Sequence, residues 1–275
     1  MIDGKRTHAR TDAINHAHRA PALLVSFFYL SQFDAIRERL NFRDWVMDSG
    51  AYSAHNSGSV IDLDAYIEKC KELLATDPKL TEVFTLDVIG DHKATRKNTE
   101  RMWAAGVPAV PVYHINEPES ALMAMAAEYP KIALGGVAML KTKAKVEWAD
   151  QCFARVWPKR IHGFGFGSEK AILALPFESV DATNWEIGPA KFGRWMAYGK
   201  LSSKGAGLNL RTEVEWFLAL EDRARIRWRK EMEVIGAQAD APSSRFVVAG
   251  TQDGRLHNAF GMEPRPGHLV HARNE

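Results

Sequence analysis

The stretch KIALGGVAMLKTKAKVEWADQCFARVW, residues 131–157, decides the fold class because it joins two hydrophobic patterns. Residues 131–137 form a short, nearly continuous apolar run, which is typical of a strand that is buried on both faces of a sheet. Residues 141–157 then distribute their apolar side chains as an amphipathic helix does. One strand followed by one helix is the repeating unit of parallel α/β proteins.

The same alternation continues in both directions along the chain. The other apolar runs are LLVSFFY (23–29), DWVMDSG (44–50), VFTLDVI (83–89), AVPVYHI (109–115), RIHGFGFG (160–167) and SVDATNW (179–185). Most of these runs precede a helix pattern, of which LDAYIEKCKELLAT at residues 63–76 is the clearest. We therefore expect an α/β fold of the (β/α)8 TIM-like barrel type, regular or irregular. A doubly wound open sheet is the alternative, but its dinucleotide-binding form is weakened because no G-x-G-x-x-G motif joins a strand to a helix.

Composition divides the chain into three parts. Residues 1–20 are polar and lack the apolar core of a signal peptide, so we expect an N-terminal tail there. Residues 21–205 hold the strand and helix candidates of the barrel catalytic domain. Residues 206–275 are expected to form a helical, basic C-terminal extension, with one long helix at residues 210–235 and a short strand candidate, RFVVAG, at residues 245–250.

Charge and composition exclude several classes of protein. The 36 Lys and Arg residues nearly balance the 34 Asp and Glu residues, so the net charge is only +2. A nucleic-acid partner would therefore have to meet a local basic patch. No run approaches the roughly 18 apolar residues of a membrane span, and we expect a soluble, cytoplasmic protein without membrane contact. Cys70 and Cys152 lie in amphipathic stretches and are expected to be reduced and structural.

No cofactor is expected. GFGFGS, residues 163–168, follows a strand candidate but lacks the lysine of a phosphate-binding loop. His257, His268 and His271 have no partner Cys or carboxylate at the spacing of a metal site. The sequence therefore predicts neither a metal nor a redox or nucleotide cofactor.

Three aspartates mark the ends of strand candidates, namely Asp48, Asp87 and Asp181. In a barrel the chemistry collects at the carboxyl ends of the strands, so these carboxylates are expected to converge on one mouth. The alternative is that some of them cap the following helices. Paired carboxylates suit chemistry at the anomeric carbon of a sugar, because one can attack C1′ while the other moves a proton. These residues alone would also allow a glycoside hydrolase.

A basic segment extends over residues 191–230 and includes Trp195 and Trp228. We expect it to contact the phosphate backbone of a nucleic acid, which would make binding strongly dependent on salt. Its expected contact residues are Lys200, Lys204, Arg223 and Arg227. The alternative is a solvated helix face with the tryptophans packed inward.

Several motifs, in order over residues 46–185, resemble those of the tRNA-guanine transglycosylase superfamily. They are DSGAYS (48–53) for the DSGGYQ-type motif, LDVIGD (86–91) for the strand-end Asp segment, ALGGVA (133–138) for the IGGLA-type loop, and IHGFGFGS (161–168) followed by SVDATNW for the glycine-rich and later Asp-bearing strands. SVDATNW is most similar to the branch that inserts 7-deazaguanine bases into DNA in phages and bacterial genomic islands.

The resemblance implies a role for each aspartate. Asp181 matches the nucleophile that displaces guanine from C1′ and forms a covalent glycosyl-aspartate. Asp48 matches the general acid/base beside the exchanged base, and Ser49 and Gly50 of the same motif are implied to line the substrate site. Asp87 is implied to pair with the N1/N2 edge of guanine or of a 7-deazaguanine.

The resemblance also implies the remaining contacts to the base. Tyr52 matches the aromatic residue that stacks on the purine face. The backbone N–H groups of Gly135, Gly136 and Val137 are implied to approach O6. His114 stands where the family often has a Gln that reads the base; alternatively, it supports another residue or faces solvent.

Departures from the family pattern bear on the substrate. The tRNA enzymes carry a structural zinc bound by three Cys and one His, whereas this chain has no cysteine after Cys152. Ile89 and Ser53 replace a Cys and a Gln of the family motifs. The resemblance therefore implies exchange of guanine in DNA for a preQ0-type 7-deazaguanine, which would protect the DNA from restriction. A tRNA-guanine transglycosylase with a reduced binding region and a non-catalytic nucleic-acid-binding paralogue are the alternatives.

Overall fold

A parallel sheet forms the centre of the molecule. The computed structural model describes residues 4–183, 185–186, 188–189, 193–197, 199–200, 210–236 and 245–249. Its main sheet consists of β1 (Ala22–Ser26), β2 (Trp45–Asp48), β3 (Leu80–Val83), β4 (Val112–His114), β5 (Lys131–Gly135), β6 (Arg160–Gly163), β7 (Ser179–Ala182) and β10 (Arg245–Ala249). These eight strands are ordered β3-β2-β1-β10-β7-β6-β5-β4, and all of their pairings are parallel. A separate antiparallel pair is formed by β8 (Arg194–Trp195) and β9 (Gly199–Lys200).

The two strands at the ends of this order, β3 and β4, also approach each other. An isolated parallel bridge joins Phe84 to Val110. The backbone N–H of Val110 donates to the carbonyl of Val83 at 2.8 Å, and the N–H of Thr85 donates to the carbonyl of Val110 at 3.0 Å. These bonds link the residues directly after β3 to those directly before β4.

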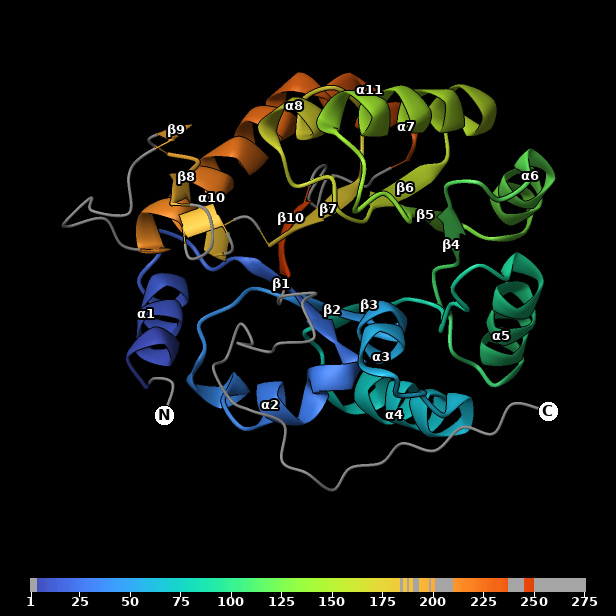
Figure 1. The fold of residues 1–275 in the computed structure, drawn as a ribbon, viewed down its shortest axis with the longest axis horizontal. Helices are drawn as coiled ribbons and strands as arrows, with labels where there is room; N and C mark the ends of the chain where they lie inside the picture. The colour runs from blue at the N-terminus through green and yellow to red at the C-terminus, as the bar shows by residue number, and fades with distance from the viewer. Residues whose placement is uncertain are drawn as a thin grey trace.

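Helices follow most strands and surround the sheet, as Figure 1 shows. The longer helices are α1 (Gly4–Asn15), α4 (Leu63–Thr76), α5 (His92–Ala104), α6 (Glu119–Glu128), α7 (Thr142–Val156) and α10 (Leu210–Arg227). The shorter ones are α2 (Leu30–Asp34), α3 (Ala51–Ser57), α8 (Glu169–Ile172) and α11 (Arg229–Val234). The predicted α/β alternation with a parallel sheet is confirmed. None of the helices in the described part of the chain is long and apolar enough to cross a membrane.

Alternate residues of the strands enter two separate apolar clusters. Leu23 and Trp45 belong to the large core between the sheet and the helices, whereas Leu24 and Val46 join a smaller cluster made by strand residues and their neighbours. Because successive side chains of a strand point to opposite faces, this division means that both faces of the sheet are covered. The continuous apolar runs of the sequence follow from this double burial.

Two expected elements have different bounds in the structure. The strand expected at residues 83–89 is instead β3, which ends at Val83, so Asp87 lies in the loop beyond the strand. The single helix expected at residues 210–235 is wrong, because the chain leaves the helical conformation at Trp228 (φ −102°, ψ 16°) and forms α10 and α11. No Gly or Pro marks this break in the sequence.

Both terminal segments contribute to the fold. Residues 4–15, expected to belong to a polar tail, form α1, in which Ala13 and Ile14 are buried in the main core. β10, from the segment expected to be an extension, lies between β1 and β7, with Val247 opposite both Ala22 and Asp181. Cys70 and Cys152 are buried and free, as expected, and burial raises the pKa of each thiol to about 12.

Candidate active site

A cavity of about 470 Å³ lies at the carboxyl ends of β2, β4 and β5. This volume falls within the usual range for small-molecule sites. Residues that the sequence singled out for substrate contact or catalysis form much of its wall: Asp48, Tyr52, Asp87, His114, Gly135, Gly136 and Val137. The structure therefore brings together residues from well-separated motifs.

Asp48 is the last residue of β2 and is aimed into this cavity by a tight turn. Its Oδ2 accepts the backbone N–H of Gly50 at 3.0 Å. Gly50 has φ +80°, and a Cβ there would lie 2.5 Å from the Oγ of Ser26, so the turn requires glycine. Withdrawal from water and the negative charges of Asp87 and Asp181 raise the pKa of Asp48 to about 7, although Gly50 opposes the shift. A carboxyl group with this pKa can both donate and accept a proton near neutral pH.

Asp87 is held by two neighbours that fix the direction of its carboxylate. The hydroxyl of Ser49 donates to Oδ1 at 3.0 Å, and Nε2 of His114 lies 3.0 Å from Oδ2. The other ring nitrogen of His114 lies 3.0 Å from Oε1 of Glu117. Burial alone would lower the pKa of His114, but the bonds to Asp87 and Glu117 raise it to about 9. His114 is therefore a cation between two carboxylates, and both of its ring nitrogens are occupied.

Asp181 lies just behind the cavity wall, on β7. It is 2% exposed, and its Oδ1 accepts the N–H of Gly165, a residue that lines the cavity, at 2.7 Å. Burial raises the pKa of Asp181 to about 6, while the Gly165 N–H and the positive charge of Lys145 act in the opposite direction. The negative charge of Asp181 is also one of the causes that raise the pKa of Asp48.

Glycine also shapes the loop that carries Gly165. A Cβ at Gly167 would lie 2.2 Å from the Cβ of Ala182 and 3.0 Å from the carbonyl oxygen of Asp181. The loop after β6 can therefore pack against the end of β7 only with glycine at this position. Lys145 of α7 completes the arrangement, since its Nζ donates to the carbonyl of Gly165 at 3.0 Å.

A buried polar layer lies beneath Asp181. His162 donates or accepts through Nδ1 at 2.8 Å from the Oγ of Ser179, and its Nε2 lies 3.9 Å from Oδ1 of Asp181. Burial, reinforced by the positive charge of Lys131, lowers the pKa of His162 well below its usual value, so the ring is neutral. Lys131 itself pairs with Glu82 at 2.7 Å and with Glu178 at 3.0 Å.

Sequence reasoning missed several residues that support the site: Glu117, Lys131, Lys145 and His162. The only signal in the sequence is a polar residue in an apolar run, as for Lys131 and His162. Lys145 looked like any polar residue of an amphipathic helix.

Two of the four residues expected to contact nucleic acid, Arg223 and Arg227, have side chains that the structure describes. Lys204 and the side chain of Lys200 are outside the described residues. Arg223 pairs with Glu169 at 2.7 Å, and the guanidinium of Arg227 lies 5.0 Å from the centroid of the Trp228 ring. Neither arginine lines the cavity.

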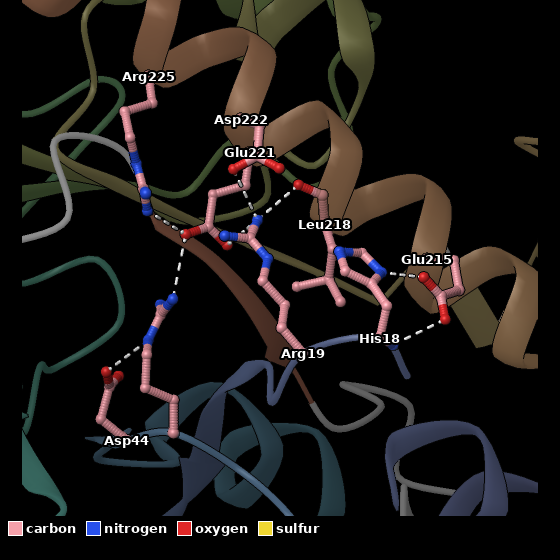
Figure 2. Close-up of polar contacts among 9 residues, drawn as sticks. His18, Arg19, Asp44, Glu215, Leu218, Glu221, Asp222 and Arg225 are labelled. Carbon is pink, nitrogen blue, oxygen red and sulfur yellow. Dashed lines mark hydrogen bonds and ion pairs between the residues drawn. The ribbon is translucent and has the colours of Figure 1, made fainter. Parts of the chain in front are cut away.

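The carboxyl-terminal half of α10 instead takes part in an ion-pair network near the amino end of β2. Figure 2 shows Arg19 and Arg225 directed at Glu221, which is 1% exposed. Three arginines contact the carboxylate of Glu221: Arg225 at 3.0 Å, Arg43 at 3.3 Å and Arg19 at 3.7 Å. Arg43 and its partner Asp44 directly precede β2, whereas Asp48 ends that strand. This network therefore anchors α10 away from the cavity.

In comparisons with known proteins, no family model and no curated protein matches the chain. The described residues contain no group of three or more His, Cys, Asp or Glu side chains that could hold a metal ion.

Proposed function

We propose that this protein is a transglycosylase that exchanges guanine in DNA for a preQ0-type 7-deazaguanine. One observation carries the proposal: Asp48, Asp87 and the Gly135–Gly136 turn line a single cavity, and Asp181 is one hydrogen bond away from its wall. The fixed carboxylate of Asp87 suits the N1–H and N2–H donors of guanine. The backbone at Gly135, Gly136 and Val137 suits O6, because glycine permits close approach.

His114 is assigned to positioning Asp87 instead of reading the base directly. Both of its ring nitrogens face carboxylates, at 3.0 Å each. Its positive charge offsets the negative charges of Asp87 and Glu117. Tyr52, which is 40% exposed at the cavity, supplies a stacking surface worth about 1–3 kcal/mol for a base.

The chemistry is a double displacement with retention. An Asp181 oxygen turns from Gly165 toward the sugar and attacks C1′, the C1′–N9 bond breaks, and the Asp48 proton goes to N9 of the departing guanine. The incoming base then gives its N9 proton to Asp48, N9 attacks C1′, and the bond to Asp181 breaks. A pKa of about 7 allows Asp48 to serve in both steps, and a pKa of about 6 keeps Asp181 mostly ionised at neutral pH.

We also propose that the sheet closes into a (β/α)8 barrel. The bridge between Phe84 and Val110 supports closure, because it joins the two strands at the ends of the order. The separate apolar cluster that contains Leu24 and Val46 would then fill the barrel interior, with the cavity at its carboxyl-terminal mouth.

The proposal is tested by incubating the protein with guanine-containing duplex DNA or tRNA and a labelled 7-deazaguanine. We expect incorporation into DNA and a covalent protein–DNA adduct on denaturation. Asp181→Ala should abolish both signals, while Asp150→Ala, on the exposed face of α7, should leave them unchanged. Persistence of exchange in Asp181→Ala would refute the mechanism. Exchange in tRNA alone would identify the tRNA enzyme as the correct alternative, and release of free sugar from oligosaccharides would favour a hydrolase.

A further inference from the structure

Large apolar side chains are unusually exposed around the cavity opening. Met139 is 93% exposed, Ile89 is 41% exposed, and both line the cavity. They come from different elements, the turn after β5 and the turn after β3, and so approach the opening from separate loops. Exposed apolar side chains grouped at the rim of a cavity indicate a contact surface for a partner larger than the molecule inside.

Hydrogen bonds fix the backbone of both turns. The N–H of Leu140 donates to the carbonyl of Val137 at 3.0 Å, and Val137 is buried. In the other turn, the N–H of Val88 donates to the hydroxyl of the buried Thr95 at 2.9 Å. Met139 and Ile89 are thus presented on fixed loops, which is what an inserting side chain needs.

Exposed lysines lie close in the chain to both rim residues. Lys93 and Lys141 are exposed and follow Ile89 and Met139 closely in the chain. His92 lines the catalytic cavity and also a second cavity of about 500 Å³ between α5 and α6, which Lys93 and Lys97 line as well. Among the described residues, neither Lys93 nor Lys97 forms an ion pair, whereas Arg96 beside them is paired with Glu100 and Glu128. Exposed apolar side chains can contact stacked bases, and the lysines that follow them in the chain can contact the phosphates beside those bases.

We propose that Met139 and Ile89 form a wedge that enters the base stack of duplex DNA where the exchanged guanine is turned into the cavity. The inference rests on the proposed base exchange and assigns its substrate class as double-helical DNA. Met and Ile are among the side chains that separate base steps in this way, and insertion offsets the unstacking that extrusion of a base requires. Lys93 and Lys141 would contact phosphates on either side of the extruded nucleotide.

The test compares exchange into a duplex with exchange into the same sequence as a single strand, for the wild type, Met139→Ala and Met123→Ala. Met123 is the matched control, because it is 45% exposed on α6 and does not line the cavity. We expect Met139→Ala to lower the ratio of duplex to single-strand rates by about tenfold, since the single strand needs little unstacking. Met123→Ala should leave the ratio unchanged. An unaltered ratio in Met139→Ala, or wild-type exchange confined to single strands, would overturn the wedge.

A second readout separates the wedge from the exchange reaction. Duplex DNA carrying 2-aminopurine beside the target guanine should fluoresce more strongly on binding the wild-type protein, and much less strongly with Met139→Ala. If this signal appears without any base exchange, the wedge stands and the proposed function fails. If exchange occurs and the two proteins give equal fluorescence, the wedge fails and the function stands; absence of both signals refutes both.

Discussion

The imidazole of His114 lies 3.0 Å from a carboxylate oxygen of Asp87, with Glu117 at the same distance on its other side. The charge on His114 thereby fixes an acceptor at the cavity wall, and the pairing also stabilises the fold. Because the pKa of His114 is raised from 6.5 to about 9, its contribution to stability is complete below pH 6.5 and is lost as the pH rises through about 9.

The first prediction follows from this loss of stability with rising pH. His114→Ala should lower the free energy of unfolding by about 3–5 kcal/mol at acidic to neutral pH, because two partly buried carboxylates lose their counter-charge. The difference between variant and wild type should shrink above about pH 9. Urea unfolding at several pH values measures it, with His55→Ala, on the exposed side of α3, as the control. A difference that grows with pH would contradict the assignment of His114 as a cation.

The second prediction concerns the pH dependence of catalysis. kcat/KM should rise as Asp181 ionises around pH 6 and fall as Asp48 loses its proton around pH 7, giving a bell-shaped profile. Lys145→Met removes a positive charge that lowers the pKa of Asp181, so the acidic limb should move to higher pH. Lys143→Met is the control, since the Lys143 side chain is 87% exposed. If the limb is fixed in Lys145→Met, Asp181 is not the group that titrates there.

The third prediction concerns the contact between Gly167 and the end of β7. Gly167→Ala would place a methyl group 2.2 Å from the Cβ of Ala182 and displace the backbone that carries Asp181. We expect a loss of about 1–3 kcal/mol of stability and a much larger loss of kcat than of substrate affinity. Gly58→Ala, at φ +69° with open space around it, should cost about 1–2 kcal/mol without changing kcat. Equal kcat values for the two variants would argue against this role of Gly167.

The fourth prediction concerns the network around Glu221. Glu221→Ala leaves Arg19, Arg43 and Arg225 without their shared carboxylate, and should reduce the free energy of unfolding by about 3–5 kcal/mol. Asp222→Asn, at a side chain that is 49% exposed, should cost less than about 1 kcal/mol. Thermal and urea unfolding measure both effects. The folded fraction of Glu221→Ala should retain its exchange rate, because the network lies away from the cavity; a lost rate would show that α10 is coupled to the site.

Much of the site could be predicted because parallel strands end at one edge. Asp48 and His114 are each the last residue of a strand. Because the carboxyl ends of parallel strands lie at one edge, the residues that end the strands can be predicted to lie around one opening. Asp87 also lines the cavity although β3 ends at Val83, since the loop after β3 leads to the same edge. The supporting residues could not be found in this way, because amphipathic spacing does not show that Lys145, unlike Lys143, reaches a loop of another unit.

The order of the strands was harder to predict than their existence. A short apolar run at residues 245–250 indicates a strand, but nothing in it specifies its neighbours. Its position between β1 and β7 depends on the whole arrangement of the other strands. Likewise, the expected basic contact surface on α10 was based on composition, whereas Arg223 and Arg225 are paired with Glu169 and Glu221.

The position of β10 has a consequence for how the protein is made. β10 lies between β1 and β7 in the sheet, and it follows all the other strands of that sheet in the chain. Until β10 has been translated, β1 and β7 each have one strand edge without its partner strand. Such edges attract pairing with other chains, so premature termination before β10 would yield a product prone to self-association and a target for chaperones and proteases.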